Sequence, residues 1–357
     1  MAGKKKLSSF AVNNIKCYGL VILAFLVLFP LQSAGVLSNS VSGQLVPICA
    51  YVVMAISLNL TVGYLGELSL GHAGFMSVGA FTGVITAVAM SQSVAVPELR
   101  LLVSIIVGGL FAGLAGLIIG IPVLRLKGDY LAIVTLAFGE IIKNIINCLY
   151  VGIDASGLHI SMTNTNDLNL DAAGKVILNG PQGAVGITKI ASFGAAVLLI
   201  LFALFIVLNL VNSKTGRAVS AIRDNRIVAE SVGIGVTRYK LTAFIISAML
   251  AGMAGALYAQ NFSTVAAQKF DFNLSILILV FVVLGGMRNI LGSIIATAVL
   301  YMLPELLRGI ADYRMLIYAI ILIAVMLLTN NMKVKTFIDT SMANIRGRLT
   351  GRKGGNS

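Results

Sequence analysis

The chain has 357 residues, of which 58% are apolar and only 11% are charged. Soluble domains carry about 25% charged residues, so this composition excludes a soluble protein. At roughly 20 apolar residues per membrane-spanning helix, the apolar content is sufficient for about ten spans. The three cysteines are far apart and the two histidines are isolated, which disfavours zinc sites, disulfide scaffolds and CxxC redox chemistry.

Ten apolar runs predict an all-α, polytopic membrane protein of about ten transmembrane helices. The first run, residues 18–31, follows four lysines, and small residues at 33–35 make a cleaved signal peptide the alternative interpretation. We favour an uncleaved helix, because the many later spans make an uncleaved first helix sufficient for insertion. The other runs cover residues 45–63, 68–90, 101–124, 131–150, 191–211, 241–260, 274–287, 290–307 and 315–329.

The basic residues predict how the chain is oriented in the membrane. Ten spans place both termini on the same side, and cytoplasmic loops are enriched in Lys and Arg. With both termini cytoplasmic, 19 of the 26 basic residues lie inside and six lie outside, so the net charge of +13 indicates orientation rather than a nucleic-acid partner. We expect a cytoplasmic amino terminus (1–17), a transmembrane domain (18–330) and a basic cytoplasmic tail (331–357).

Two long segments lie between the spans. Residues 151–190 are polar and predicted to be extracytoplasmic, either as a solvated loop or as a surface that also meets a partner. Residues 212–240 are predicted to be cytoplasmic and to contain a short amphipathic helix, which either rests on the headgroups or is presented to another protein. The repeat positions of this helix are Val219, Ile222, Arg226, Ala229 and Val232, and its end is marked by Gly233 and Gly235.

Polar residues interrupt the apolar runs at a few positions. A glycine-rich polar break at residues 64–72 predicts a broken or re-entrant helix, which is tolerated only where it is buried in protein or lines an aqueous cavity. His72 either borders a translocation path or, as we favour, is hydrogen-bonded between helices. Glu140 and Lys143 have the spacing of a same-face ion pair, which we favour over a proton relay. The candidates for the path are Glu67, Ser69, Gly71, His72 and Glu140.

Small residues and a second break add to this pattern. Residues 284–289 contain two glycines followed by Arg288, which predicts a turn at the cytoplasmic side because a continued helix would bury the arginine. Close helix packing is predicted by pairs of small residues four positions apart. These pairs are Gly79 with Gly83, Gly109 with Gly113, Gly116 with Gly120, and Ala251 with Gly255.

No recognised catalytic motif is found in the sequence. It contains no HExxH, no GxSxG and no GxxxxGK[ST], so ATP-driven transport would need a partner that binds the ATP. An ATP-independent secondary transporter or channel is the alternative from another class, and a membrane enzyme is the least favoured.

Five segments carry a family resemblance. They read GYLGELSLGHAGF at 63–75, LRLKGDYLAIVTLAFGEII at 124–142, GRAVSAIRDN at 216–225, GIGVTRYKLTAF at 233–244 and VLGGM at 283–287. In this order, over roughly residues 45–330, the chain resembles the permease subunits of bacterial branched-chain amino acid ABC importers. Of the two paralogous permeases, it is most similar to the M-type.

The resemblance implies a multi-pass protein of the bacterial cytoplasmic membrane that acts within an importer. Its partners would be a second permease of the H-type, two ATP-binding subunits and an extracytoplasmic solute-binding protein. This chain itself would bind no cofactor, because the partner subunits would hydrolyse the ATP. Leu, Ile and Val are the usual substrates, and related members import urea or other amino acids.

In such importers a cytoplasmic permease loop docks into the ATPase. The corresponding stretch here is residues 216–239, which would act as a lever that switches the pore between outward- and inward-facing states. Its glycines come earlier than in the general importer motif. The candidates for coupling to the ATPase are Arg217, Arg223, Asp224, Glu230, Gly233 and Gly235.

Overall fold

The computed structural model describes residues 9–330, apart from positions 37, 92, 127, 155, 172, 173 and 308–312. The predicted basic tail, 331–357, therefore lies outside the described residues, as does the start of the predicted amino-terminal segment. The chain divides into two units, the first ending at Val299 and the second beginning at Leu300.

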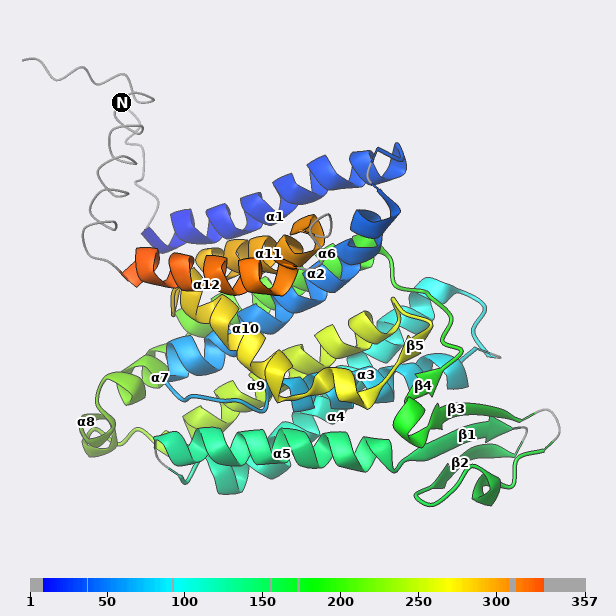
Figure 1. Ribbon diagram of the computed structural model, residues 1–357. Helices are drawn as coiled ribbons and strands as arrows, with labels where there is room; N and C mark the ends of the chain where they lie inside the picture. Colours follow the sequence, from blue (N-terminus) through cyan, green and yellow to red (C-terminus); the bar gives the residue numbers. More distant parts are fainter. Residues whose placement is uncertain are drawn as a thin grey trace, which may run out of the picture. The chain divides into compact units, whose positions relative to one another are not determined.

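Helices make up most of the first unit (Figure 1). Several begin with a residue suited to a helix start: Pro97 is the first residue of α4, and Ser192, Ser213 and Asp271 accept hydrogen bonds from the first turns of α6, α7 and α10. The helices are α1 (Ser9–Ser33), α2 (Asn39–Leu58), the π-helical turn Asn59–Leu65, α3 (His72–Ala89), α4 (Pro97–Val123), α5 (Asp129–Asn147), α6 (Phe193–Asn212), α7 (Lys214–Asp224), α8 (Arg226–Ser231), α9 (Val236–Ala259), α10 (Phe272–Gly285) and α11 (Ile290–Leu306). α11 crosses into the second unit, which also contains α12 (Arg314–Asn330).

Each of the ten predicted apolar runs falls on a described helix. Within the described residues, seven helical segments are long and apolar enough to cross a membrane. They are 14–33, 39–65, 72–89, 97–123, 130–147, 193–212 and 236–259. The other three runs fall on α10, α11 and α12, which have 14, 17 and 17 residues. A polytopic helical membrane protein is therefore confirmed, and the span number of ten stays a prediction.

The core of the first unit is a close contact among α3, α4 and α9. A Cβ atom built at Gly79 of α3 would lie 2.1 Å from the carbonyl oxygen of Gly252 in α9, and one at Gly255 would lie 1.9 Å from that of Met76. On α4, a Cβ at Gly116 would lie 2.7 Å from the Ala248 side chain. The small-residue pairs predicted from the sequence thus bring helices of the same chain together.

A small antiparallel sheet adds to the predicted helical fold. Its strands, in spatial order, are β2 (Gly157–Ser161), β1 (Tyr150–Asp154), β3 (Lys175–Asn179), β4 (Ala184–Val185) and β5 (Thr264–Val265). Four strands come from the predicted extracytoplasmic segment, which is therefore folded rather than a plain solvated loop. The fifth comes from the connection between α9 and α10, where Val265 pairs with Ala184. Both connections thus lie at the same end of the unit.

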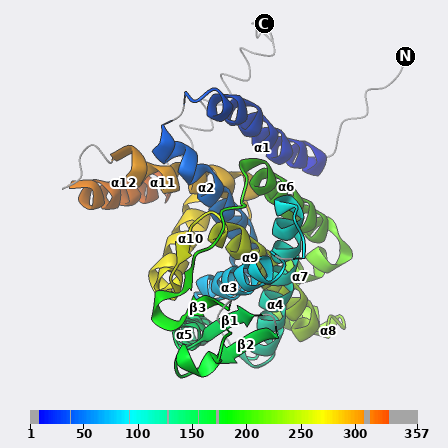
Figure 2. The same ribbon diagram turned by 90° about the vertical axis from the view of Figure 1, so that its right-hand side faces the viewer.

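The sheet and the predicted cytoplasmic segment lie at opposite ends of the first unit. In Figure 1, α7 and α8 lie at the left end and the strands at the right end, with α5 running between them. Figure 2 views the unit from the sheet end, where β1, β2 and β3 lie beside α5. This arrangement agrees with the predicted placement of the two segments on opposite sides of a membrane.

Candidate functional site

The break between α2 and α3 contains several of the predicted path residues. The π-helical turn ends at Leu65 and is followed by Gly66, whose φ of +78° favours glycine; the chain is then non-helical until α3 starts at His72. Along the break, the Leu70 N–H donates to Thr135 Oγ1 over 3.1 Å. A Cβ atom at Gly71 would lie 2.2 Å from the Thr135 carbonyl oxygen, so this position requires glycine. We call residues 66–71 the re-entrant segment.

His72 is buried at the end of the re-entrant segment, between α2 and α9. Its Nε2 lies 3.0 Å from Ser57 Oγ and 3.2 Å from Ser247 Oγ. Both hydroxyl protons are used elsewhere, because Ser57 donates to the Met54 carbonyl and Ser247 donates to the Ser57 carbonyl. Nε2 therefore carries a proton, which these two hydroxyl oxygens accept. His72 is a histidine hydrogen-bonded between helices, as the favoured interpretation states.

Two buried polar atoms near this point have no hydrogen-bond partner within the described part of the chain. They are Nδ1 of His72 and Oγ of Ser69. A role of Ser69, Gly71 and His72 in a path stays a prediction.

Glu67 and Glu140 are separated by the fold. The Glu67 carboxylate is paired with the ammonium of Lys240, a residue of the predicted cytoplasmic segment that sequence reasoning did not single out. Glu140 forms the predicted ion pair with Lys143, one turn further along α5. A lysine at the border of an apolar run was the signal that could have identified Lys240, because a buried charge requires a partner.

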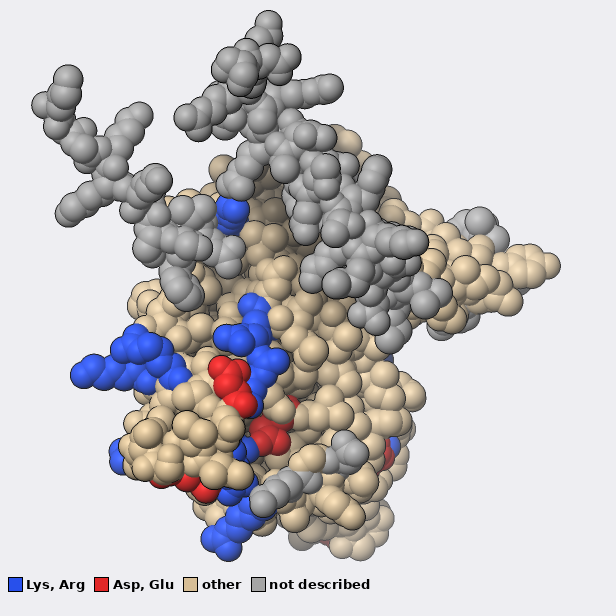
Figure 3. Space-filling model, turned by 90° about the vertical axis from the view of Figure 1, so that its left-hand side faces the viewer, with Lys and Arg blue, Asp and Glu red and all other residues tan. Residues whose placement is uncertain are grey.

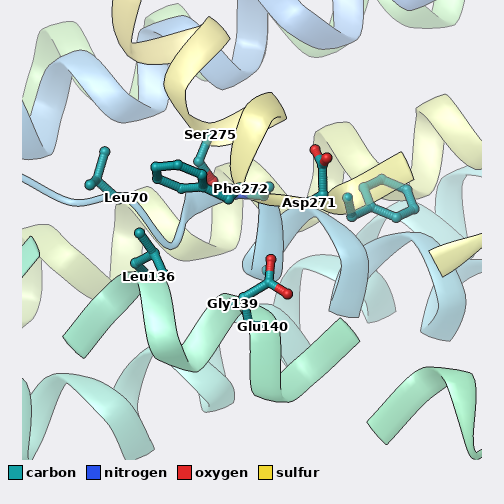
Figure 4. Close-up of a pocket in the computed structure, with 10 residues that line it drawn as sticks. Leu70, Leu136, Gly139, Glu140, Asp271, Phe272 and Ser275 are labelled. Atoms are coloured by element: carbon teal, nitrogen blue, oxygen red, sulfur yellow. Dashed lines mark hydrogen bonds between the residues drawn. The ribbon is translucent and has the colours of Figure 1, made fainter. Parts of the chain in front are cut away.

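Glu140 also lines a pocket between α3, α5 and the start of α10 (Figure 4). Asp271, which caps α10, is the second carboxylate at this pocket, and Ser275 lies one turn further along that helix. The Ala73 N–H at the start of α3 donates to Ser275 Oγ over 3.1 Å. The pocket thus lies where α3 and α10 begin.

The second glycine break packs onto the first. The turn after α10 places Arg288 at φ +69°, and its backbone N–H donates to Asn59 Oδ1 over 3.0 Å. The Tyr64 hydroxyl donates to the Arg288 carbonyl over 3.0 Å, and the guanidinium lies 5.9 Å from the Tyr64 ring centre. A turn at Arg288 was predicted, but its contact with the π-helical turn was not.

The predicted amphipathic helix consists of two helices, α7 and α8, rather than one. Asn225 separates them, because its side-chain oxygen accepts hydrogen bonds from the Ile227 and Val228 N–H groups and so starts a new helix. Of the predicted repeat positions, Val219, Ile222 and Ala229 are buried within the protein. Val232 was predicted to share that face, but it is 69% exposed and follows Ser231, the last residue of α8.

The predicted coupling residues differ in what they contact. Arg223 donates from Nη1 to the Gly63 carbonyl over 2.5 Å, whereas Arg217 donates to the Asn212 carbonyl over 3.2 Å. Asp224, the last residue of α7, is exposed. Glu230 forms an i,i+4 pair with Arg226 over 2.9 Å. Arg223 is thus the candidate that connects this segment to the break.

The two coupling glycines also differ. Gly233 ends α8 with φ +83°, and the next N–H, of Ile234, donates to the Ala229 carbonyl over 3.0 Å in a typical helix C-cap. Gly235 has φ −72°, and a Cβ atom there would meet nothing within 4 Å. Only Gly233 is required by the backbone conformation.

The surface of α8 was not predicted from the sequence pattern. Ile227, Val228 and Val232 are 79%, 56% and 69% exposed, so they form an apolar projection at this end of the unit. Lys and Arg side chains gather on the same end (Figure 3). An apolar projection beside basic side chains is typical of a protein-binding surface.

Comparison with known proteins agrees with these features. The family described as branched-chain amino acid transport system / permease component matches residues 40–328. The chain is 32% identical over 311 residues to the high-affinity branched-chain amino acid transport system permease protein LivM of Salmonella typhimurium. It is 33% identical over 311 residues to the protein of the same name in Escherichia coli.

Each of these two alignments covers 78% of this chain and 66% of the relative, so the chain spans slightly less than two thirds of the length of these relatives. No solved structure matches the chain. The family match covers most of the chain and includes both glycine breaks and the segment with α7 and α8. The chain therefore belongs to the family of permease components of branched-chain amino acid transport systems.

Proposed function

We propose that this chain is the membrane permease of an ATP-driven importer for branched-chain amino acids. It forms part of the translocation path, and separate subunits bind and hydrolyse ATP. The single observation that carries the ATP-driven part is the apolar projection on α8, which is exposed at the end of the unit opposite the sheet. The substrate class is supported by the family and by the names of the two relatives.

The projection has the chemistry of a docking element. Ile227, Val228 and Val232 would enter an apolar groove on an ATP-binding subunit, and the surrounding basic side chains would meet acidic groups at its rim. Burial of three such side chains supplies about 1.5–3 kcal/mol each when they are fully covered. The ion pair between Arg226 and Glu230 lies on α8 next to these apolar side chains.

Closure of the ATP-binding subunits would move α7 and α8 and, through them, the packed helices. The two glycine breaks are the points at which the spans change direction, and they lie against each other through Asn59, Tyr64 and Arg288. Rigid parts that rock around such breaks alternate the access to a path between the two sides. The path needs to pass only a small zwitterion, because selection by a solute-binding protein precedes it.

The proposed assembly contains a second permease of the H-type, two ATP-binding subunits and an extracytoplasmic solute-binding protein. In this assembly the sheet lies on the extracytoplasmic side, where it is available to the solute-binding protein. Both termini lie in the cytoplasm of a bacterial cell.

The deciding experiment measures substrate and energy source separately. The cognate solute-binding protein is titrated by calorimetry with Leu, Ile, Val, other amino acids and urea, and the reconstituted complex is assayed for uptake with and without internal ATP. We expect binding of Leu, Ile or Val and uptake only with ATP. Binding of urea alone would contradict the proposed substrate class. Uptake by the permease without ATP or its ATP-binding partner would favour a secondary transporter or channel.

A further inference from the structure

Two part-buried polar contacts join α7 and α9 to the first glycine break. The Lys240 ammonium is paired with the Glu67 carboxylate, and these side chains are only 8% and 14% exposed. Arg223 donates from Nη1 to the carbonyl oxygen of Gly63 over 2.5 Å. The partners are 173 and 160 positions apart in the sequence, so these contacts connect separate parts of the fold.

Apolar contacts reinforce the same junction. Leu65, the last residue of the π-helical turn, packs in a buried cluster with Val219 of α7 and Ala243 of α9. The aliphatic part of Arg223 lies over Gly66, where a Cβ atom would be 2.7 Å from Arg223 Cγ. The break is thus held from two sides by α7 and α9.

α7, α8 and the first turn of α9 form one compact part, which we call the coupling block (residues 214–240). Ile222, Ala229 and Val236, one from each helix, form a buried cluster. Tyr239 packs against this cluster and also against the cluster that contains Leu65. A force applied to α8 would therefore move these helices together rather than bend α8 alone.

The far end of the re-entrant segment is held as firmly as the near end. Gly71 is closely packed on the Thr135 backbone, and His72 is hydrogen-bonded to Ser57 and Ser247. Only five residues lie between Gly66 and His72, so the re-entrant segment is a short connection with packed contacts at both ends. Movement of Glu67 would therefore be passed to Ser69 and the start of α3.

We propose that Lys240 and Arg223 are positioning residues that transmit movement of the coupling block to the re-entrant segment. They do not touch ATP, and their partners are Glu67 and the Gly63 carbonyl. The Lys240–Glu67 pair joins two side chains, so its charges can be exchanged, whereas the acceptor for Arg223 is a backbone carbonyl. This inference rests on the proposed function, because it takes the movement of α8 to be driven by ATP-binding subunits.

The experiment follows two cysteine reporters in the reconstituted complex with its ATP-binding subunits. The native Cys148 is exposed and is first replaced by Ser, whereas Cys17 and Cys49 are buried. One reporter is Ser231→Cys on α8 and the other is Ser69→Cys in the re-entrant segment. The rate of reaction with a water-soluble maleimide is measured with and without a non-hydrolysable ATP analogue.

With native Lys240, we expect the nucleotide to change the labelling rate of both reporters by at least about fivefold, the lower end of usual coupling between sites. In Lys240→Met, the reporter on α8 should respond as before, whereas the response at Ser69→Cys should fall below about twofold. The charge-swapped double variant Glu67→Lys with Lys240→Glu should recover the response. An unchanged response at Ser69→Cys in Lys240→Met would overturn the proposal.

Failures of the two proposals give different results. If neither reporter responds to nucleotide when Lys240 is native, the ATP-driven function is wrong. If only the α8 reporter responds, docking is correct and the transmission is wrong. Should Lys240→Met fail to fold because it leaves Glu67 as an unpaired buried charge, the double variant Glu67→Gln with Lys240→Met removes both charges and serves in its place.

The matched control is Lys143→Met, which also removes a lysine–glutamate pair. Both residues of that pair are on α5, so the pair connects no separate elements. Both reporters should respond normally in Lys143→Met. A loss of the Ser69→Cys response there equal to that in Lys240→Met would show a general effect of charge removal and would contradict the proposal.

Discussion

Single residues decide how closely the central helices of this protein approach. Gly79, Gly252 and Gly255 place backbone against backbone, where any side chain would occupy the space of a carbonyl group. The sequence motif indicates that such contacts exist, and the fold shows which helices make them. The same residue-scale logic distinguishes His72, which is hydrogen-bonded on one nitrogen, from an ordinary solvated histidine.

Gly79→Ala should destabilise the first unit. Its Cβ would lie 2.1 Å from the Gly252 carbonyl oxygen, so α3 and α9 must separate at a cost of roughly 1–3 kcal/mol. We expect a lower unfolding temperature of the purified protein in detergent. Gly194→Ala in α6 is the control, because nothing lies within 4 Å of its Cβ. Equal unfolding temperatures for the two variants would contradict the packing described for α3 and α9.

Asp154 should titrate at unusually low pH. Its Oδ1 accepts hydrogen bonds from the Ser156 hydroxyl and N–H and is contacted by His159, and the Ser156 bond first of all lowers the pKa of the carboxyl from its ordinary 3.8 to about 2. Because the folded pKa is depressed, the stabilisation of the β1–β2 turn is fully present above about pH 3.8. It is lost as the pH falls through about 2.

Carboxyl ¹³C NMR of aspartate-labelled protein measures this titration, and the signal missing in Asp154→Asn identifies the residue. The turn of Asp154→Asn, monitored through its backbone amide signals, should show no pH dependence in the same range. A midpoint near the ordinary aspartate value would mean that the hydrogen bonds from Ser156 do not stabilise the charged carboxylate.

At the scale of elements, α7 and α8 connect the exposed surface to the breaks. The start of α8 depends on the cap at Asn225 and its end depends on Gly233, and both residues can be recognised in the sequence as helix start and stop signals. Their contacts with the π-helical turn depend on α9, which presents Lys240 and Ala243 to the same region. An element that appears as a surface helix in the sequence is therefore part of a larger packed block.

Gly233→Ala should weaken binding to the ATP-binding subunits, and Gly235→Ala should not. Alanine at φ +83° costs roughly 1–2 kcal/mol, which is about 5–30-fold in an equilibrium that needs this turn. Gly235→Ala adds a methyl group in open space at an ordinary φ. Affinities of the detergent-solubilised permease variants for the subunits test this. If both variants lost the same affinity, the effect would come from the added methyl group and not from backbone strain at Gly233.

Glu230→Arg tests the docking surface itself. It replaces the partner of Arg226 by a like charge on the next turn of α8 and reverses a charge beside the apolar projection. We expect reduced ATPase coupling, measured as stimulation of ATP hydrolysis by the loaded solute-binding protein, with normal insertion in the membrane. Normal ATP-driven uptake by a well-expressed variant would count heavily against docking at α8.

At the scale of the whole first unit, the sheet and the apolar projection on α8 lie at opposite ends. The sheet joins connections from two distant parts of the chain, and α7 and α8 lie at the other end (Figure 1). The first unit also contains the helical segments that are long and apolar enough to cross a membrane.

Membrane-impermeant thiol labelling should report these two ends from opposite sides. Cys148 lies at the end of α5 beside β1 and is exposed, so intact cells should label it from outside. In a Cys148→Ser background, Ser231→Cys on α8 should be labelled only in inside-out vesicles. Labelling of both positions from one side would overturn the predicted orientation.

The sequence by itself determined the properties that depend on local composition and spacing. The apolar runs are long enough to require helices, the glycine clusters at 63–71 and 285–286 interrupt them, and Glu140 and Lys143 lie one turn apart. The segment 212–240 was predicted to contain one short amphipathic helix; it contains the two helices α7 and α8, with Val219, Ile222 and Ala229 buried and Val232 exposed. Each of these properties follows from a few neighbouring residues.

Only the tertiary structure decided which distant groups satisfy one another. Glu67 faces Lys240, His72 lies between Ser57 and Ser247, and a strand from the α9–α10 connection completes the sheet. Buried charges and polar groups must find partners once water is excluded, but many partners satisfy that requirement equally well in the sequence. The choice is made when glycine contacts bring α3, α4 and α9 together and thereby fix which polar groups meet.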